Sequence, residues 1–162
     1  HQPILALVDQ ETKEHLEKFN FSKIHIKVGA DKEHLQEELD ALLMERFLEL
    51  DGYKNIYKAS SSNDAFLILE EITPDLIVLF FRQLEENGPT GIDLFRWFKQ
   101  LPKLKKTSFL LYHIVLHREL CQELKDMGFS GVLGHPLDFR ETLHACSIVL
   151  DGGTYYRDCN KY

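Results

Sequence analysis

The chain has 162 residues, of which 44% are hydrophobic and 28% are charged, and its formal net charge is -7. A chain of this length is about one domain and buries enough surface to fold without a metal or a disulfide. Its acidic balance disfavours direct binding of nucleic acid, because phosphate contacts need a broad basic surface.

The sequence also argues against a membrane location. The longest uninterrupted apolar run, Leu76 to Phe81, is far shorter than the roughly 20 residues that span a bilayer. The first residues lack the basic start of a secretory signal. Three cysteines, Cys121, Cys146 and Cys159, are widely spaced, which fits reduced thiols. We therefore expect a cytoplasmic protein.

The amino-terminal part of the sequence allows two interpretations. Residues 23–28 (KIHIKV) have the composition of a strand, and residues 4–8 (ILALV) also form a short apolar run. In the favoured interpretation, residues 23–28 are the first strand of the domain, and an extra strand and a short helix precede it. In the alternative, residues 4–8 are the true first strand and residues 10–30 are an insertion. The first interpretation is favoured because it needs no large insertion.

From residue 22 onward strand-like and helix-like segments alternate, which predicts βα units on a mostly parallel sheet. Strands are expected over 55–59, 75–81, 108–113 and 131–134, and helices over 31–50, 63–72, 92–101, 117–127 and 138–150. Apolar stripes should face the sheet from two helices: Leu35, Leu39, Leu42, Leu43, Phe47 and Leu50 in the first, and Phe139, Leu143, Cys146 and Leu150 in the last.

Several segments, taken in order, resemble receiver domains of bacterial response regulators. They are PDLIVLF, a glycine eleven residues after Phe80, TSFLLYH, MGFSGVLGHP and LDGGTYY, and they cover residues 22–156. The last of them is similar to the join between a receiver and a DNA-binding domain of the LuxR/NarL type. The resemblance also implies a cis bond between His135 and Pro136.

The fold implied is α/β: a flavodoxin-like, doubly wound parallel sheet of five strands in the order 2-1-3-4-5, with helices on both faces. Residues 1–21 would then be an N-terminal extension, residues 22–152 the receiver-like domain, and residues 153–162 a tail or linker.

The resemblance also locates the positions at which receivers carry out phosphoryl transfer, where the acceptor must be a carboxylate. The acceptor position is Phe80, and a phenyl ring cannot be phosphorylated. With Phe80, the other positions form a degenerate pocket: the acidic pair becomes Ala30 and Asp31 (Asp9 and Gln10 in the alternative register), the phosphate-sensing Ser or Thr becomes Tyr112, and the lysine becomes His135. Outside this pocket, the aromatic switch position of the fifth strand becomes Val132.

We therefore expect a phosphorylation-independent interaction domain of a bacterial signalling or transcription-regulatory protein, with no enzymatic activity, cofactor or metal. Its partner would be another protein or a second copy, bound through the fourth helix, fifth strand and fifth helix of the receiver pattern. Trp97 is a further candidate, because it and Phe98 are adjacent on a helix and cannot both face the core. The candidates on the main face are His117, Leu120, Lys125, Val132, Asp138 and Arg140.

Two alternatives stay open. The chain could be an unusual receiver that accepts phosphate on Asp31 or Asp75. It could also be a sensor of a small ligand, with Phe80, Tyr112 and His135 forming an aromatic, titratable pocket at the carboxyl edge of the sheet. The competing interpretation of these three side chains is that they fill a vacated site without leaving a buried charge unpaired.

Overall fold

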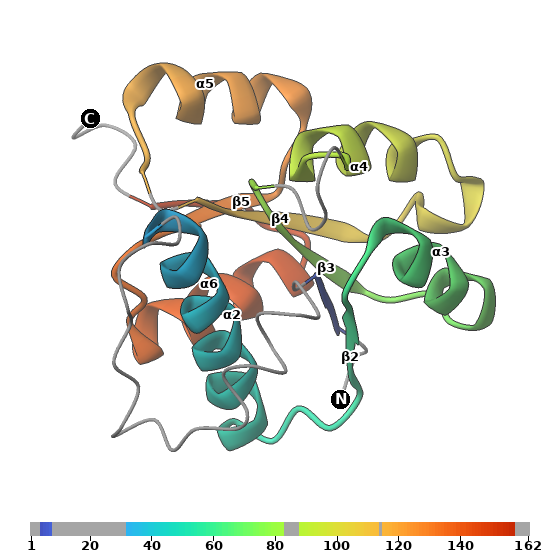
Figure 1. Cartoon of the computed structure of the whole chain (residues 1–162), viewed down its shortest axis with the longest axis horizontal. Coiled ribbons are helices and arrows are strands. Elements are labelled where there is room, and N and C mark those ends of the chain that lie inside the picture. The colour runs from blue at the N-terminus through green and yellow to red at the C-terminus, as the bar shows by residue number, and fades with distance from the viewer. Residues whose placement is uncertain (1–3, 8–31, 83–87, 114, 158–162) are drawn as a thin grey trace.

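The computed structural model describes residues 4–7, 32–82, 88–113 and 115–157. Within them a parallel six-stranded sheet has the order β2-β1-β3-β4-β5-β6 (Figure 1). Its strands are Ile4–Leu7 (β1), Ile56–Ala59 (β2), Leu76–Phe80 (β3), Ser108–His113 (β4), Gly131–Gly134 (β5) and Tyr155–Tyr156 (β6). The predicted order of the first five strands is confirmed, and β6 extends the sheet beside β5.

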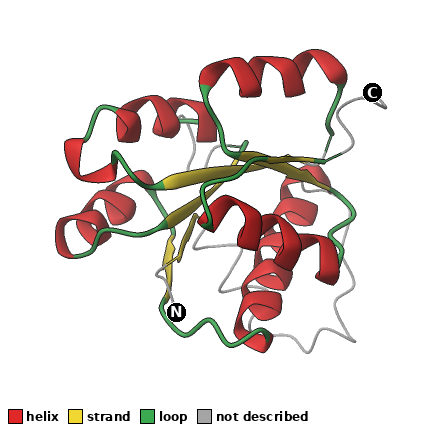
Figure 2. Cartoon of the chain, turned by 180° about the vertical axis from the view of Figure 1, so that it is seen from behind, coloured by secondary structure: helices red, strands yellow, loops and turns green. Residues whose placement is uncertain are grey.

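Helices cover both faces of this sheet, as the two opposite views show (Figures 1 and 2). One face carries Lys32–Leu50 (α2) and Phe139–Leu150 (α6). The other carries Ser62–Glu71 (α3), Gly91–Lys99 (α4) and Arg118–Met127 (α5), and a short 3-10 helix, Pro102–Leu104 (η2), follows α4. The predicted doubly wound α/β class is therefore confirmed.

Side-chain caps fix where four of the helices begin. Ser61, Thr90, His117 and Asp138 each precede a helix and accept a hydrogen bond from a backbone N–H in its first turn. Such caps satisfy donors that the helix itself leaves unpaired. Each of these helices follows a strand, so the caps also order the loops at the carboxyl edge of the sheet, where doubly wound folds place their functional sites.

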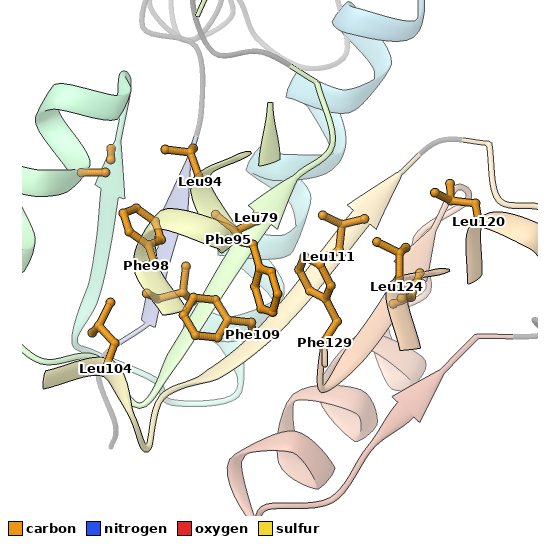
Figure 3. Close-up of a cluster of buried hydrophobic side chains, with 14 of the residues drawn as sticks. Leu79, Leu94, Phe95, Phe98, Leu104, Phe109, Leu111, Leu120, Leu124 and Phe129 are labelled. Carbon is orange, nitrogen blue, oxygen red and sulfur yellow. The ribbon is translucent and has the colours of Figure 1, made fainter. Parts of the chain in front are cut away.

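Strand β3 separates two apolar cores and is buried at every position. On the α3–α4–α5 side, Phe95 stacks on Phe129 with ring centroids 3.9 Å apart and meets the edge of Phe109 at 5.1 Å (Figure 3). On the α2–α6 side, Val78 and Phe80 pack with residues of both helices. The sequence correctly predicts β3 as a central strand, apolar on both faces.

The favoured interpretation of the amino terminus is wrong. Strand β1, Ile4–Leu7, lies between β2 and β3, in the register Ile4 to Ile56 on one side and Ile4 to Leu76 on the other. Residues 23–28 lie outside the described residues. A central strand and an extra one have the same local composition, so only pairing in the sheet distinguishes them. The sheet therefore includes two strands outside the predicted domain range 22–152: β1 before it and β6, at residues 155–156, after it.

The apolar stripe predicted for the first long helix is also wrong. Ala41, Met44 and Leu48 of α2 enter the core, whereas Leu43 is 37% and Leu50 64% exposed. Both sets of residues recur at helical spacing, and the sequence periodicity cannot choose between two apolar faces. The other predicted members, Leu35, Leu39, Leu42 and Phe47, are partly buried.

The last helix is rotated in a similar way. Ala145 and Val149 of α6 are buried beside Cys146, while Phe139 is 40% exposed. Of the predicted stripe only Cys146 reaches the buried core, and Leu143 and Leu150 pack against it from partly buried positions. The residues of α6 that face the sheet are therefore smaller than the predicted ones.

The cysteines differ from the expectation of three reduced thiols. Cys121 of α5 is disulfide-bonded, and Cys146 is a buried free thiol whose pKa burial raises to about 12. Disulfide formation needs two α-carbons within about 7 Å, which spacing along the chain does not reveal. The cysteines therefore no longer support a reducing compartment. Within the described part of the chain, no helix has the length and apolar character to cross a membrane.

Candidate functional site

Three of the residues predicted for the degenerate pocket meet at the carboxyl edge of the sheet. Phe80 ends β3 and pairs in register with Tyr112 of β4, and their ring centroids are 5.3 Å apart. His135 directly follows β5 and, as the receiver resemblance implies, forms a cis bond with Pro136. The other two predicted residues, Ala30 and Asp31, lie outside the described residues.

A carboxylate from α2 connects this edge to the helix layer. The Tyr112 hydroxyl donates a hydrogen bond to Oδ2 of Asp40, and Nδ1 of His135 lies 2.9 Å from the same oxygen. The other oxygen, Oδ1, accepts a hydrogen bond of 3.0 Å from Nε2 of Gln36. The Asp40 side chain is 2% exposed, so it is a buried acceptor engaged on both oxygens. These residues, Asp40, Tyr112 and His135, are called the Asp40 network below.

The network differs in exposure from one end to the other. Tyr112 is fully buried, and its pKa is raised well above the ordinary value by burial first, and then by its hydrogen bond to Asp40 and by that charge. The His135 side chain is 38% exposed and forms the outer end. A phenol held in its neutral form donates a hydrogen bond to Asp40 throughout the physiological range.

A second buried carboxylate lies on the same helix. Oε1 of Glu37 accepts a hydrogen bond of 3.3 Å from the backbone N–H of Arg82, two residues after β3, and Oε2 is buried without a hydrogen-bond partner. The pKa of Glu37 is raised to about 8: burial is the largest cause, the Arg82 N–H and guanidinium oppose it, and the charges of Glu38 and Asp40 add to it. Glu37 is therefore mostly protonated at neutral pH.

Asp40 and Glu37 are the site residues that the sequence does not single out. Both lie on α2 beside Ala41, Met44 and Leu48, on the face that enters the core. Their one sequence signal is that their spacing puts them on the same helical face as this small apolar set. A stronger leucine-rich stripe on the same helix hides that signal.

The end of β3 at the described carboxyl edge carries aromatic side chains. Phe80 is apolar, the next residue Phe81 stacks on His113 with centroids 4.2 Å apart, and Oδ2 of Asp40 already has two partners. Asp75, one of the two alternative acceptors, precedes β3 and is exposed at the opposite edge of the sheet. Among the described residues no cluster of three or more metal-ligating side chains occurs.

The candidate residues on the main interface face divide into two groups. His117, Lys125, Asp138 and Arg140 are exposed around the edge formed by α5, α6 and β6. Two other candidates, Leu120 and Val132, are 7% and 0% exposed and belong to the core, so their prediction as contacts is corrected. An apolar side chain on an amphipathic element faces the core before it faces a partner. On α4, Trp97 is 47% exposed and Phe98 is buried, as the sequence predicts for this adjacent pair.

The β5 side of this interface also differs from expectation, because β6 covers it. Tyr155 and Tyr156 pair with β5, and the Arg157 N–H donates to the carbonyl of Val132 at 3.0 Å. Nε of Arg157 lies 3.1 Å from Oε1 of Glu141 on α6, and the Arg157 guanidinium donates to the carbonyl of Gly134. The exposed edge therefore consists of β6 with α5 and α6 on either side.

No family model matches the chain, and no curated protein matches it. Solved structures of receiver domains do. A LuxR-family two-component response regulator from Aurantimonas is 16% identical, with 99% of this chain and 94% of that chain covered and a TM-score of 0.62.

Two other solved structures extend the comparison. The signal receiver domain of a histidine kinase from Syntrophus aciditrophicus is 20% identical, with coverages of 94% and 92% and a TM-score of 0.62. The isolated receiver domain of RcsB from Salmonella enterica serovar Typhimurium, in the presence of phosphomimetic BeF3-, is 9% identical, with coverages of 98% and 96% and a TM-score of 0.66. The predicted resemblance is thus confirmed: this chain has the fold of response-regulator receiver domains.

Proposed function

We propose that the chain is a receiver-like interaction domain of a bacterial signalling or transcription-regulatory protein, and that it works without phosphorylation. The observation that carries this proposal is Phe80 at the end of β3, only 3% exposed and packed against Tyr112. A phosphoryl acceptor at this point would have to be an accessible carboxylate. Here the position holds a buried hydrocarbon ring.

The Asp40 network supports the same proposal. In a switchable receiver, the groups at the ends of β4 and β5 must be free to bind a newly attached phosphoryl group. In this chain both groups, the Tyr112 hydroxyl and His135, already contact one buried carboxylate. A phosphoryl group brought into this pocket would meet a buried negative charge, which disfavours its formation by repulsion and desolvation. The pocket is therefore stabilised in one arrangement.

The partner surface that we propose is the edge of the sheet formed by β6 with α5 and α6. Its exposed charges have both signs: Lys125, whose Nζ lies 4.8 Å from the centre of the Tyr156 ring, Arg140, and the helix cap Asp138. A mixed surface of this kind matches a second copy of the chain or a partner protein, since opposite charges steer the two surfaces together.

Phosphorylation is tested by incubating the purified chain with acetyl phosphate and Mg²⁺ and measuring its intact mass, with a phosphorylatable receiver treated in parallel as the positive control. We expect no phosphoryl adduct on this chain. Stoichiometric labelling of any aspartate would refute the phosphorylation-independent function.

The interaction surface is tested separately by sedimentation of the wild type and the Arg140→Glu variant over a range of concentrations. If the surface joins two copies, the variant should dissociate at a concentration about tenfold higher, because one charge at the surface is reversed. Lys54→Glu, at an exposed position before β2, is the matched control. A chain that stays monomeric at every concentration would exclude the homodimer and leave a different protein as the partner.

A further inference from the structure

A second surface, distant in the sheet order from the β6 edge, has a charge opposite to that of the whole chain. It consists of Arg96, Trp97, Lys99, Lys105 and Lys106, all of them exposed, and is called the α4–η2 surface below. The sequence contains no Asp or Glu between Asp93 and Glu119. A chain with a net charge of -7 therefore has one uninterrupted cationic segment, and this segment carries its only tryptophan.

The helical geometry of α4 arranges the first three of these residues around the buried Phe98. With about 100° of rotation per residue, Trp97 and Lys99 lie on opposite sides of Phe98 and Arg96 points outward. The ring centroids of Trp97 and of Phe66 on α3 are 6.3 Å apart, and Nζ of Lys99 is 5.8 Å from the centre of the Phe109 ring of β4. The surface thus extends from α3 across α4 to the start of β4.

The chain beneath this surface is well fixed. Leu104 of η2 is 1% exposed and lies in the core with Phe98 and Phe109 (Figure 3). The hydroxyl of Thr107 donates a hydrogen bond of 2.7 Å to the carbonyl of Pro74, and the ammonium of Lys103 donates to the carbonyl of Leu69 in α3. The backbone that carries Lys105 and Lys106 is therefore anchored at both ends, which lowers the entropy cost of binding through it.

The cations of the surface have no acidic counterpart in the described part of the chain. Arg96, Lys99, Lys105 and Lys106 form no ion pair with any described carboxylate, whereas Arg157 and Lys58 elsewhere do. Four exposed cations and a half-exposed indole on α4 and the segment after η2 give this surface a positive charge and one exposed aromatic ring. Trp and Arg are the residue types most enriched at the centres of protein interfaces.

We propose that the α4–η2 surface binds an acidic protein segment that places an apolar side chain over Trp97. Charge complementarity selects an acidic partner, and the indole selects one with an apolar residue between its acids. A single-stranded nucleic acid is the other polyanion that binds cations and aromatic rings, but it needs a series of stacking rings, and this surface offers one. The net charge of the chain, -7, also repels a long polyanion. The α4–η2 surface would act independently of the β6 edge.

Trp97 itself reports on binding, since no other tryptophan contributes to the fluorescence. The test titrates the wild type with three probes: a short peptide of glutamates around a central leucine pair, the same peptide with lysine in place of glutamate, and a single-stranded oligothymidylate. We expect saturable binding of the glutamate peptide with a blue shift of the emission, weakened by added salt because the charges are exposed. The lysine peptide should leave the spectrum unchanged.

Two variants assign the binding to this surface. The double variant Lys105→Glu/Lys106→Glu should lower the affinity for the glutamate peptide at least about tenfold, because two attractive charges become repulsive ones. Lys54→Glu should bind like the wild type, and circular dichroism checks that each variant is folded. No saturable change with the glutamate peptide, or equal binding of the lysine peptide, would overturn the proposal. Tighter binding of the oligothymidylate would overturn the assignment to a protein partner.

Discussion

Asp40 is the residue on which the described carboxyl edge depends most. It is a buried carboxylate with three donors around it, from β4, from the segment after β5 and from its own helix. A buried charge is tolerated when hydrogen bonds replace the water it has lost, and removing its partners leaves the full cost of desolvation. Asp40 therefore holds α2 against the ends of two strands by polar contacts inside an otherwise apolar layer.

Replacing Asp40 by Asn should lower the free energy of unfolding by about 2–3 kcal/mol, because the charged acceptor of Tyr112 and His135 is lost. Urea denaturation measures the change. Asp126→Asn is the matched control: Asp126 also accepts from a glutamine four residues earlier, Gln122 at 2.9 Å, but it is exposed on α5. The control should change stability by less than about 0.5 kcal/mol. Equal effects of the two variants would show that the Asp40 network contributes nothing beyond the local pair.

At the scale of elements, the short strand β6 does more than lengthen the sheet. It covers β5, and Arg157, which follows it, contacts both Glu141 of α6 and the carbonyl that ends β5. The Tyr155 hydroxyl donates a hydrogen bond of 3.0 Å to the same glutamate. A two-residue edge strand is too short to template further pairing. These side-chain contacts therefore hold the last described residues against α6.

Arg157→Ala should destabilise the chain by about 2 kcal/mol, since both partners of the ion pair are largely buried, at 13% and 21% exposure, and Glu141 would be left uncompensated. The comparison is Arg46→Ala, which removes the exposed pair of Arg46 and Glu49 on α2. An exposed ion pair contributes about 0–1 kcal/mol to stability, so the control substitution should leave the stability nearly unchanged. Thermal unfolding of the two variants and the wild type measures the difference. An Arg157→Ala variant with the unfolding temperature of the wild type would mean that the contacts of Arg157 contribute nothing to stability.

At the scale of the whole molecule, two buried groups oppose each other in the dependence of stability on pH. The pKa of Glu37 is raised to about 8. Its contribution to the free energy of unfolding is therefore fully present below pH 4.5 and is lost as the pH rises through 8. Burial, with the Arg82 and His117 charges, lowers the pKa of His113 to about 4, so its contribution is present above pH 6.5 and is lost as the pH falls through 4. Between pH 4.5 and 6.5 the two slopes cancel.

Two variants should separate these opposing slopes. Glu37→Gln should become progressively more stable than the wild type from pH 4.5 to 8, by up to a few kcal/mol at about 1.4 kcal/mol per pKa unit. His113→Phe keeps an aromatic ring against Phe81, and it should become increasingly more stable than the wild type as the pH falls from 6.5 to 4. Denaturation at several pH values measures both, and Glu70→Gln at an exposed position is the control. A Glu37→Gln curve parallel to the wild type would contradict the raised pKa.

The local sequence determined most of the elements and their order after residue 50. Strands β3, β4 and β5 and helices α4 and α5 begin and end within two residues of their predicted bounds. The reason is that caps, glycines, prolines and apolar runs act on neighbouring residues, so their effect can be read along the chain. The meeting of Phe80, Tyr112 and His135 follows from the same parallel order, because consecutive strands bring their carboxyl ends to one edge.

Only the tertiary structure decided the rest. Which apolar face of α2 enters the core, which of two similar segments becomes β1, and whether residues 155–156 join the sheet all depend on partners distant in the chain. Asp40 became part of the site for the same reason: its partners Tyr112 and His135 are 72 and 95 residues away along the chain. A local pattern sets which residues a helix presents on each face, but burial against the sheet chooses the face, and that choice placed a carboxylate inside this molecule.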